Sequence, residues 1–157
     1  MLCRPDISAA RRITNAYFAS HHCGEAAGGE LVWLNNRHNA WVAASQKGGR
    51  RRADLEAAAL DLRRRKAAAS PVDILALLRL VADVGGNAIL QTLSICAVSF
   101  GLRSYFDPTV PMTAEGVTFA EAMVTAILEG APDRASQWQD RLNSHLQLRL
   151  EEGLRVA

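Results

Sequence analysis

The chain has few of the residues and patterns that mark disulfide-rich, secreted or membrane-spanning proteins. Its three cysteines, Cys3, Cys23 and Cys96, are odd in number and far apart, which excludes a disulfide framework. No apolar run reaches the roughly 18 residues that span a bilayer, because Arg79, Asp83 and glycines interrupt the longest one. The N-terminus lacks the charged and then apolar layout of a secretory signal. We therefore expect a cytoplasmic protein without a membrane segment.

Net charge and proline are also low. The formal charge is only +2, so the overall balance points to neither an anionic nor a cationic partner. Only five prolines occur in 157 residues, of which 49% are hydrophobic, with many alanines and leucines. This composition predicts one all-helical domain that is long enough to bury a core.

The spacing of apolar residues and the positions of helix-ending residues predict seven helical segments. Glycine, proline and capping residues separate them, and the small residues 24–29 are expected to form a loop. The expected helices cover residues 6–22, 30–45, 50–69, 71–85, 87–105, 114–128 and 132–154. Short connections favour antiparallel neighbours, so we predict an all-α, single antiparallel bundle of six to seven helices. Residues 1–24 are expected to form a linker-like helix that continues into a bundle of residues 25–157.

The apolar faces of the later helices support a bundle. Ile74, Leu77, Leu78, Val81 and Val84 recur at three- and four-residue spacing, as do Val117, Ala120, Val124, Ile127 and Leu128. In the last helix the inward stripe is expected to contain Ala135, Trp138, Leu142, His145 and Leu146. His145 is thus expected to point toward the interior.

Three polar residues are candidates for a site in the bundle. His145 is either a core histidine that is satisfied by a neighbouring group, a donor to a ligand carboxylate, or a metal ligand. Asp73 follows Ser70–Pro71 and fits a helix cap, with a pocket role as the alternative. Asn87 fits a cap or turn, although its side chain would also suit the mouth of a cavity.

Other clusters carry less weight. Neighbours on a helix diverge by about 100°, so the segment 21–23 (His-His-Cys) does not face one ion. The basic runs 50–52 and 63–66 favour a solvated face over phosphate contacts, because the four consecutive basic residues of the second run fan around their helix. Asp61 is placed to pair with Arg65. No catalytic triad or acid–base pair has a convincing spacing, and we expect no enzyme.

The second half of the chain resembles a known family. Residues 82–93 (ADVGGNAILQTL) form a helix that ends in Gly-Asn before an apolar helix. Residues 126–130 (AILEG) precede a helix with an Ala…His-Leu pattern. This order is similar to the FCD domain, the ligand-sensing and dimerising half of FadR-type GntR transcription regulators. The N-terminal residues 2–21 also resemble the segment that follows the winged DNA-binding domain in this family.

The resemblance implies a central pocket that binds a small organic acid, often beside a divalent metal held by an Asp and three His. Here Leu78 occupies the first His position, Ile74 occupies the Asp position with Asp73 one residue away, and Ala120 occupies the second His position. His145 alone remains, about one turn beyond the family spacing. We therefore expect no metal and no cofactor.

The sequence thus predicts the effector-binding, homodimerising domain of a GntR/FadR-like regulator. It would contact DNA only through a winged helix-turn-helix that the sequence does not contain. The expected ligand-binding residues are His145, Asp73, Asn87, Leu77, Leu78, Ala120, Met123 and Leu142. The alternative is a structural or interaction module in which apolar side chains fill the core. An open cavity with His145 on its wall would favour sensing.

Overall fold

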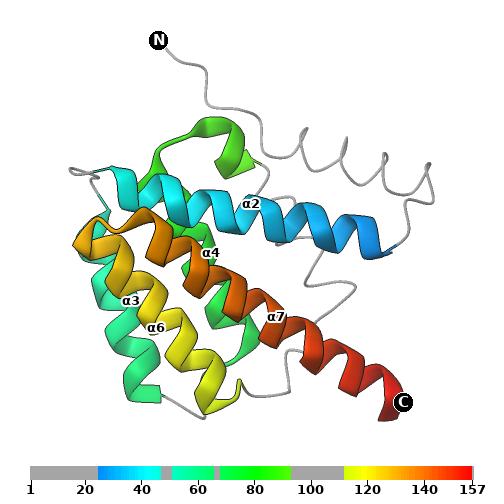
Figure 1. The fold of residues 1–157 in the computed structure, drawn as a ribbon. Helices are drawn as coiled ribbons and strands as arrows, with labels where there is room; N and C mark the ends of the chain where they lie inside the picture. Colours follow the sequence, from blue (N-terminus) through cyan, green and yellow to red (C-terminus); the bar gives the residue numbers. More distant parts are fainter. Residues whose placement is uncertain (1–24, 47–50, 66–67, 93–111, 157) are drawn as a thin grey trace.

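The computed structural model describes residues 25–46, 51–65, 68–92 and 112–156, without the side chains of 25–31 and 147–156. Helices and short connections make up these residues, with no strand among them, so the all-α prediction is confirmed. The helices are α2 (Glu25–Ser45), α3 (Arg52–Arg65), α4 (Pro71–Gly85), α6 (Ala114–Glu129) and α7 (Pro132–Val156) (Figure 1). The predicted helix 6–22, the linker-like segment 1–24 and most of the predicted helix 87–105 lie outside the described residues.

Helix ends follow the predicted local signals. The Ser70 hydroxyl accepts from the backbone N–H of Asp73, and the Asp73 carboxylate accepts from the N–H of Ser70, which completes a capping box before Pro71. Gly86 ends α4 with a φ of 66°, and Gly130 ends α6 with a φ of 72°. Both glycines adopt the left-handed conformation that favours a residue without a Cβ.

The start of α2 differs from the prediction. We expected a loop over the small residues 24–29, but the helix already begins at Glu25 and contains Gly28 and Gly29. Each glycine costs about 1 kcal/mol in a helix relative to alanine, and the neighbouring Ala26 and Ala27 are strong helix formers. The loop prediction was therefore wrong for residues 25–29.

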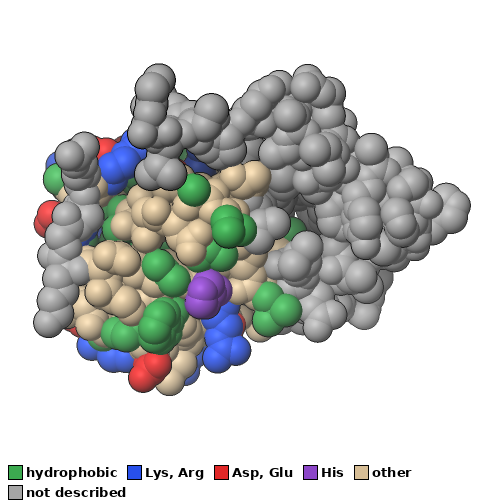
Figure 2. Space-filling model, turned by 90° about the horizontal axis from the view of Figure 1, so that it is seen from above, with side chains coloured by type: hydrophobic (Ala, Val, Ile, Leu, Met, Phe, Trp, Pro, Cys, Tyr) green, Lys and Arg blue, Asp and Glu red, His purple; other side chains and the backbone are tan. Residues whose placement is uncertain are grey.

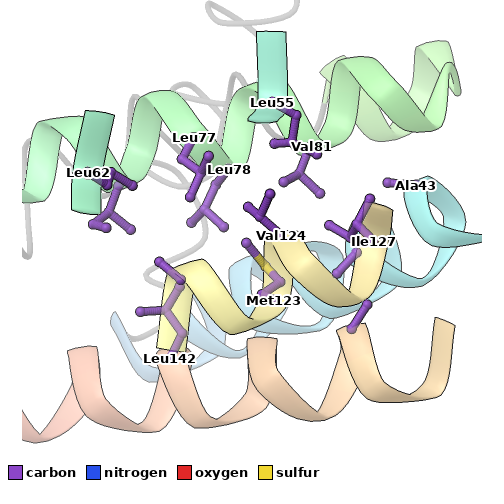
Figure 3. Close-up of a cluster of buried hydrophobic side chains, with 14 of the residues drawn as sticks. Ala43, Leu55, Leu62, Leu77, Leu78, Val81, Met123, Val124, Ile127 and Leu142 are labelled. Carbon is purple, nitrogen blue, oxygen red and sulfur yellow. The ribbon is translucent and has the colours of Figure 1, made fainter. Parts of the chain in front are cut away.

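The core lies where α3 and α4 face α6. Leucine and valine side chains of α3 and α4 point toward the side chains of α6, with Ala43 of α2 at one end and Leu142 of α7 at the other (Figure 3). The predicted stripe of α4 is buried throughout, and in α6 only Leu128 is half-buried. In α7, Ala135, Leu142 and Leu146 are buried, whereas Trp138 and His145 are half-buried. No helix in the described ranges is long and apolar enough to cross a membrane.

Arginines connect the helices around this core. Arg51 pairs with Asp54 and with Asp83 of α4, and Arg65 pairs with Asp61 and Asp73. The predicted pairing of Asp61 with Arg65 is therefore confirmed. These arginines serve intramolecular ion pairs, which reduces the basic charge that they present to a nucleic acid.

Arg52 has a separate role at two helix ends. Its guanidinium donates to the carbonyls of Ile127 and Leu128 in the last turn of α6 and to the carbonyl of Gln46 after α2. Carbonyls in a last helical turn have no partner within the helix, so a cation that binds them contributes both hydrogen bonds and a favourable interaction with the dipole.

Removal of Arg52 should therefore destabilise the whole domain. We expect Arg52→Ala to lower the free energy of unfolding by about 1.5–3 kcal/mol, the range for hydrogen bonds to a charged group. Urea denaturation followed by circular dichroism measures the change. The exposed Arg64 gives a control, because Arg64→Ala should stay within about 0.5 kcal/mol of the parent. Equal losses in the two variants would contradict the role of Arg52.

Asp73 should give part of the acid dependence of stability. Burial alone would raise the pKa of this carboxyl, but the Ser70 N–H, the Arg65 guanidinium and the Ser70 hydroxyl together hold it below its ordinary value. A lowered folded-state pKa stabilises the protein above the unfolded value of about 3.9, and the contribution disappears as the pH falls through the folded value.

Asp73→Asn should cost about 1 kcal/mol at neutral pH, as the loss of a helix cap does, and much less at pH 3. Denaturation curves at pH 7, 5 and 3 test this, with Glu56→Gln on the exposed face of α3 as the control. A cost that is the same at all three pH values would show that the carboxylate charge contributes nothing.

Candidate functional site

The apolar residues of the predicted pocket lie in the packed core. Leu77 and Leu78 of α4, Ala120 and Met123 of α6, and Leu142 of α7 all belong to one buried cluster (Figure 3). Leu77 is 1% exposed, and Ala120, Met123 and Leu142 are fully buried. Their side chains contact the neighbouring helices, so the structure brings these five residues together as packing.

The two polar candidates near α4 lie at opposite ends of this helix. Asp73 belongs to the N-terminal capping box and pairs with Arg65. Asn87 follows the C-terminal Gly86, where its side-chain oxygen accepts from the N–H groups of Ile89 and Leu90. Asn87 thus caps the helix that starts at residue 88, and Asn87 is exposed to solvent. The structure does not bring Asp73 and Asn87 together.

His145 binds the N-terminus of α6. Its Nε2 lies 2.7 Å from the hydroxyl of Thr113, which also accepts from the N–H of Gly116, and its Nδ1 lies 3.8 Å from the carboxylate of Glu115. Nε2 thus shares a hydrogen bond with the Thr113 hydroxyl, while Nδ1 faces the Glu115 carboxylate. The ring also meets the edge of Phe119.

Gly116 makes this contact possible. A Cβ at this position would lie 3.0 Å from Cδ2 of His145 and 2.6 Å from the terminal carbon of Met112. The histidine therefore rests against the backbone of the first turn of α6. Its side chain is 13% exposed, and its contacts are with a helix terminus.

A polar layer joins α2 to α7. The buried face of α2 consists of asparagines and alanines, and that of α7 contains Ser136, Gln139 and Asn143; the α2 residues are Asn35, Asn36, Asn39, Ala40, Ala43 and Ala44. Nε2 of Gln139 donates to Oδ1 of Asn143, and Nδ2 of Asn143 lies 3.4 Å from the carbonyl oxygen of Trp33. These short side chains let the two helices approach closely.

The two helices run antiparallel (Figure 1). Trp33 lies beside Asn143, and Nε of Arg37 lies 3.4 Å from the carboxylate of Asp140, so increasing numbers on α2 meet decreasing numbers on α7. Trp41 therefore lies at the end of the interface where α7 begins.

A cleft of about 640 Å³ opens along this interface. Residues from one face of α2 and from the first two turns of α7 line it: Leu34, Arg37, His38, Trp41, Asp133, Ser136 and Gln137. Hydrophobic side chains reach the surface on the side of the molecule where α2 lies, next to a histidine and a basic side chain (Figure 2). The volume lies in the range of sites that bind small molecules.

The lining combines apolar, charged and hydroxyl groups. Leu34 is 56% exposed and Trp41 is 43% exposed, although both are large hydrophobic residues. The rings of His38 and Trp41 are nearly parallel, with centroids 6.2 Å apart. Ser136 is only 7% exposed and adds a hydroxyl to the lining.

The sequence analysis did not identify this cleft. Leu34, His38 and Trp41 are spaced by four and three residues, which places them on one helix face. The opposite face of the helix carries asparagines and alanines. A small, polar face of this kind suits close helix packing, and it could have shown that the face with Leu34, His38 and Trp41 is turned outward. Over the described ranges, no three His, Cys, Asp or Glu side chains gather as a metal site would require.

The contact of His145 with Thr113 can be measured by a double-mutant cycle. Thr113→Val removes the cap and His145→Ala removes the ring, and each should cost about 1–2 kcal/mol. Because the two side chains share one hydrogen bond, the double variant should cost at least about 0.5 kcal/mol less than the sum. Urea denaturation gives all four values. Strict additivity would contradict the contact.

Comparison of the chain with protein-family models, with curated proteins and with solved structures gives no match. The geometry of the two helix interfaces and the cleft therefore carries the functional argument.

Proposed function

We propose that this chain is a non-enzymatic regulatory domain that binds a small molecule and pairs with a second copy, similar in layout to the FCD domain of GntR/FadR-type regulators. It would act on a DNA-binding domain. The turn at Gly86 with the cap by Asn87, and the end of α6 at Gly130 before Pro132, support the proposal. They lie in the segments that resemble the family.

The observation that carries the proposal is the cleft between α2 and α7. This cleft combines a suitable volume with aromatic, charged and hydroxyl groups. The apolar residues that the resemblance suggested as a pocket are packed against one another. A ligand among them would have to displace buried side chains, whereas the cleft is open to solvent. We therefore assign the effector to the cleft.

The proposed mechanism is a population shift. A ligand in the cleft touches both α2 and α7, so it stabilises the arrangement in which these helices are in contact. The buried polar residues of α2 and α7 are Asn35, Asn36, Asn39, Ser136, Gln139 and Asn143, which bury less apolar area than the leucines of the core. The α2–α7 interface is therefore the weaker of the two interfaces and the better suited to respond to a ligand. In a dimer, the change would alter the spacing of two DNA-reading heads.

The second candidate is an interaction module without a ligand. Its support is the dense core, in which Leu77, Met123 and Leu142 are almost completely buried. Under this hypothesis the exposed apolar side chains would contact a partner protein, and the cleft would be a surface depression. The two hypotheses differ in their response to small molecules.

Thermal unfolding with a library of small organic acids and amines tests the proposal. A ligand at 100 times its dissociation constant adds about 2.7 kcal/mol, which raises the melting temperature by roughly 5–10 °C in a chain of this size. Ser136→Leu should abolish the shift, because the longer side chain fills the floor of the cleft. Ser144→Leu, on the exposed face of the same helix, should keep it.

Two results would contradict the assignment. A shift that survives Ser136→Leu would mean that the ligand binds elsewhere. A library without any stabilising compound would favour the interaction module. Sedimentation velocity on the same samples measures pairing, which we expect as a dimer whose stability increases with ligand.

A further inference from the structure

We propose that the α2–α7 cleft binds a primary amine with an apolar body. The ammonium group would lie among Asp133, Ser136 and the face of Trp41, with the apolar part along α2 toward Leu34. This inference rests on the proposed function, because it names the chemical class of the ligand for the same cleft. Three independent features of the lining support it.

The first feature is charge. Arg37, His38 and Asp133 are the ionisable residues that line the cleft. Arg37 already pairs with Asp140, whereas Asp133 forms no ion pair within the described part of the chain. Of the guanidinium and the carboxylate in the lining, the Asp133 carboxylate is therefore the charge that is left for a ligand. Asp133 lies in the first turn of α7, where a carboxylate interacts favourably with the helix dipole. The negative charge of Asp133 also favours a bound cation at the Trp41 end of the cleft.

The second feature is the exposed aromatic surface. Trp41 is 43% exposed, and tryptophan has the aromatic face that attracts cations most strongly. Trp138 already uses its face in this way, because the guanidinium of Arg141 lies 4.6 Å from its ring centroid. Among the described residues, no Lys or Arg lies over Trp41, and His38 stacks against its ring at a centroid distance of 6.2 Å. The exposed part of the ring is the surface that a cation from outside the chain would meet.

The third feature is the pair of acceptors on α7. Asp133 and Ser136 are three residues apart, so they lie on the same face of the helix, one turn from each other. Ser136 is 7% exposed, and its hydroxyl is an acceptor on the α7 side of the cleft lining. A primary ammonium carries three N–H donors, enough for the carboxylate and the hydroxyl at once.

The length of the cleft sets the size of the apolar part. Leu34 and Trp41 are seven residues apart on α2, which corresponds to about 10 Å along the helix at 1.5 Å per residue. An ammonium group at the Trp41 end therefore leaves room for a chain or ring of several carbons that reaches the exposed side chain of Leu34.

Isothermal titration with two matched probes tests the inference. Phenylbutylamine carries the ammonium on a body of suitable length, and phenylpentanoate has the same phenyl-alkyl body with a carboxylate. We expect the amine to bind the full chain and the acid to bind at least about tenfold more weakly. Asp133→Asn and Trp41→Leu should each weaken amine binding about three- to fivefold, as the loss of an exposed ion pair or cation–π contact does. Asp54→Asn makes the same charge change outside the cleft and should leave the affinity unchanged.

The outcomes separate the inference from the proposed function. Binding of the acid but not the amine, lost in Ser136→Leu, would overturn the amine assignment and leave the effector site in place. Amine binding that neither Asp133→Asn nor Trp41→Leu weakens would also overturn it. If neither probe binds, the amine assignment is overturned. If the wider library also gives no thermal shift, the proposed function is overturned as well. Circular dichroism of each variant shows whether it is folded.

Discussion

The close packing of α2 against α7 is the constraint on which the candidate site depends. The buried face of α2 is made of asparagines and alanines, which bury little volume, and α7 contacts α2 at Trp33 and Arg37. Because short side chains occupy this face, the large apolar residues Leu34 and Trp41 are left on the other side of the helix, in contact with solvent. The cleft exists because the polar layer determines which face of α2 is turned outward. Hydrogen bonds from Gln139 and Asn143 hold that layer together.

The leucine-rich core has a different role from this interface. Side chains of α3, α4 and α6 fill the centre, and Arg52 ties the end of α6 to the residues that follow α2. A buried leucine contributes about 1.5–3 kcal/mol, so this part supplies most of the hydrophobic stabilisation. The α2–α7 interface adds less apolar burial and more hydrogen bonds. The fold thus combines a stable centre with one interface that a ligand in the cleft can strengthen.

The helices could largely be predicted from the sequence, but the site could not. Ser70, Pro71, Gly86 and Gly130 act locally, so their caps were predicted at the correct residues. The start of α2 was missed because two glycines resemble a loop signal. His145 was expected to face the interior, and its side chain is only 13% exposed; its partner, Thr113 at the N-terminus of α6, was not predicted. That contact depends on Gly116, 29 positions earlier in the chain, whose missing Cβ makes room for the ring. The cleft was missed because periodicity shows which residues share a face and does not show which face is buried.

Fluorine NMR of the protein labelled with 5-fluorotryptophan tests most directly where a small molecule binds. Trp41 lines the cleft, whereas Trp138 lies beside Phe119, whose ring also contacts His145. The chain has three tryptophans, and the resonances of Trp41 and Trp138 report on the cleft and on the region around His145. The variants Trp33→Phe, Trp41→Phe and Trp138→Phe assign the three resonances. We predict that addition of phenylbutylamine shifts the Trp41 resonance and leaves that of Trp138 in place. A shift of Trp138 with an unchanged Trp41 would contradict the account, because the ligand would then lie near His145 instead of between α2 and α7.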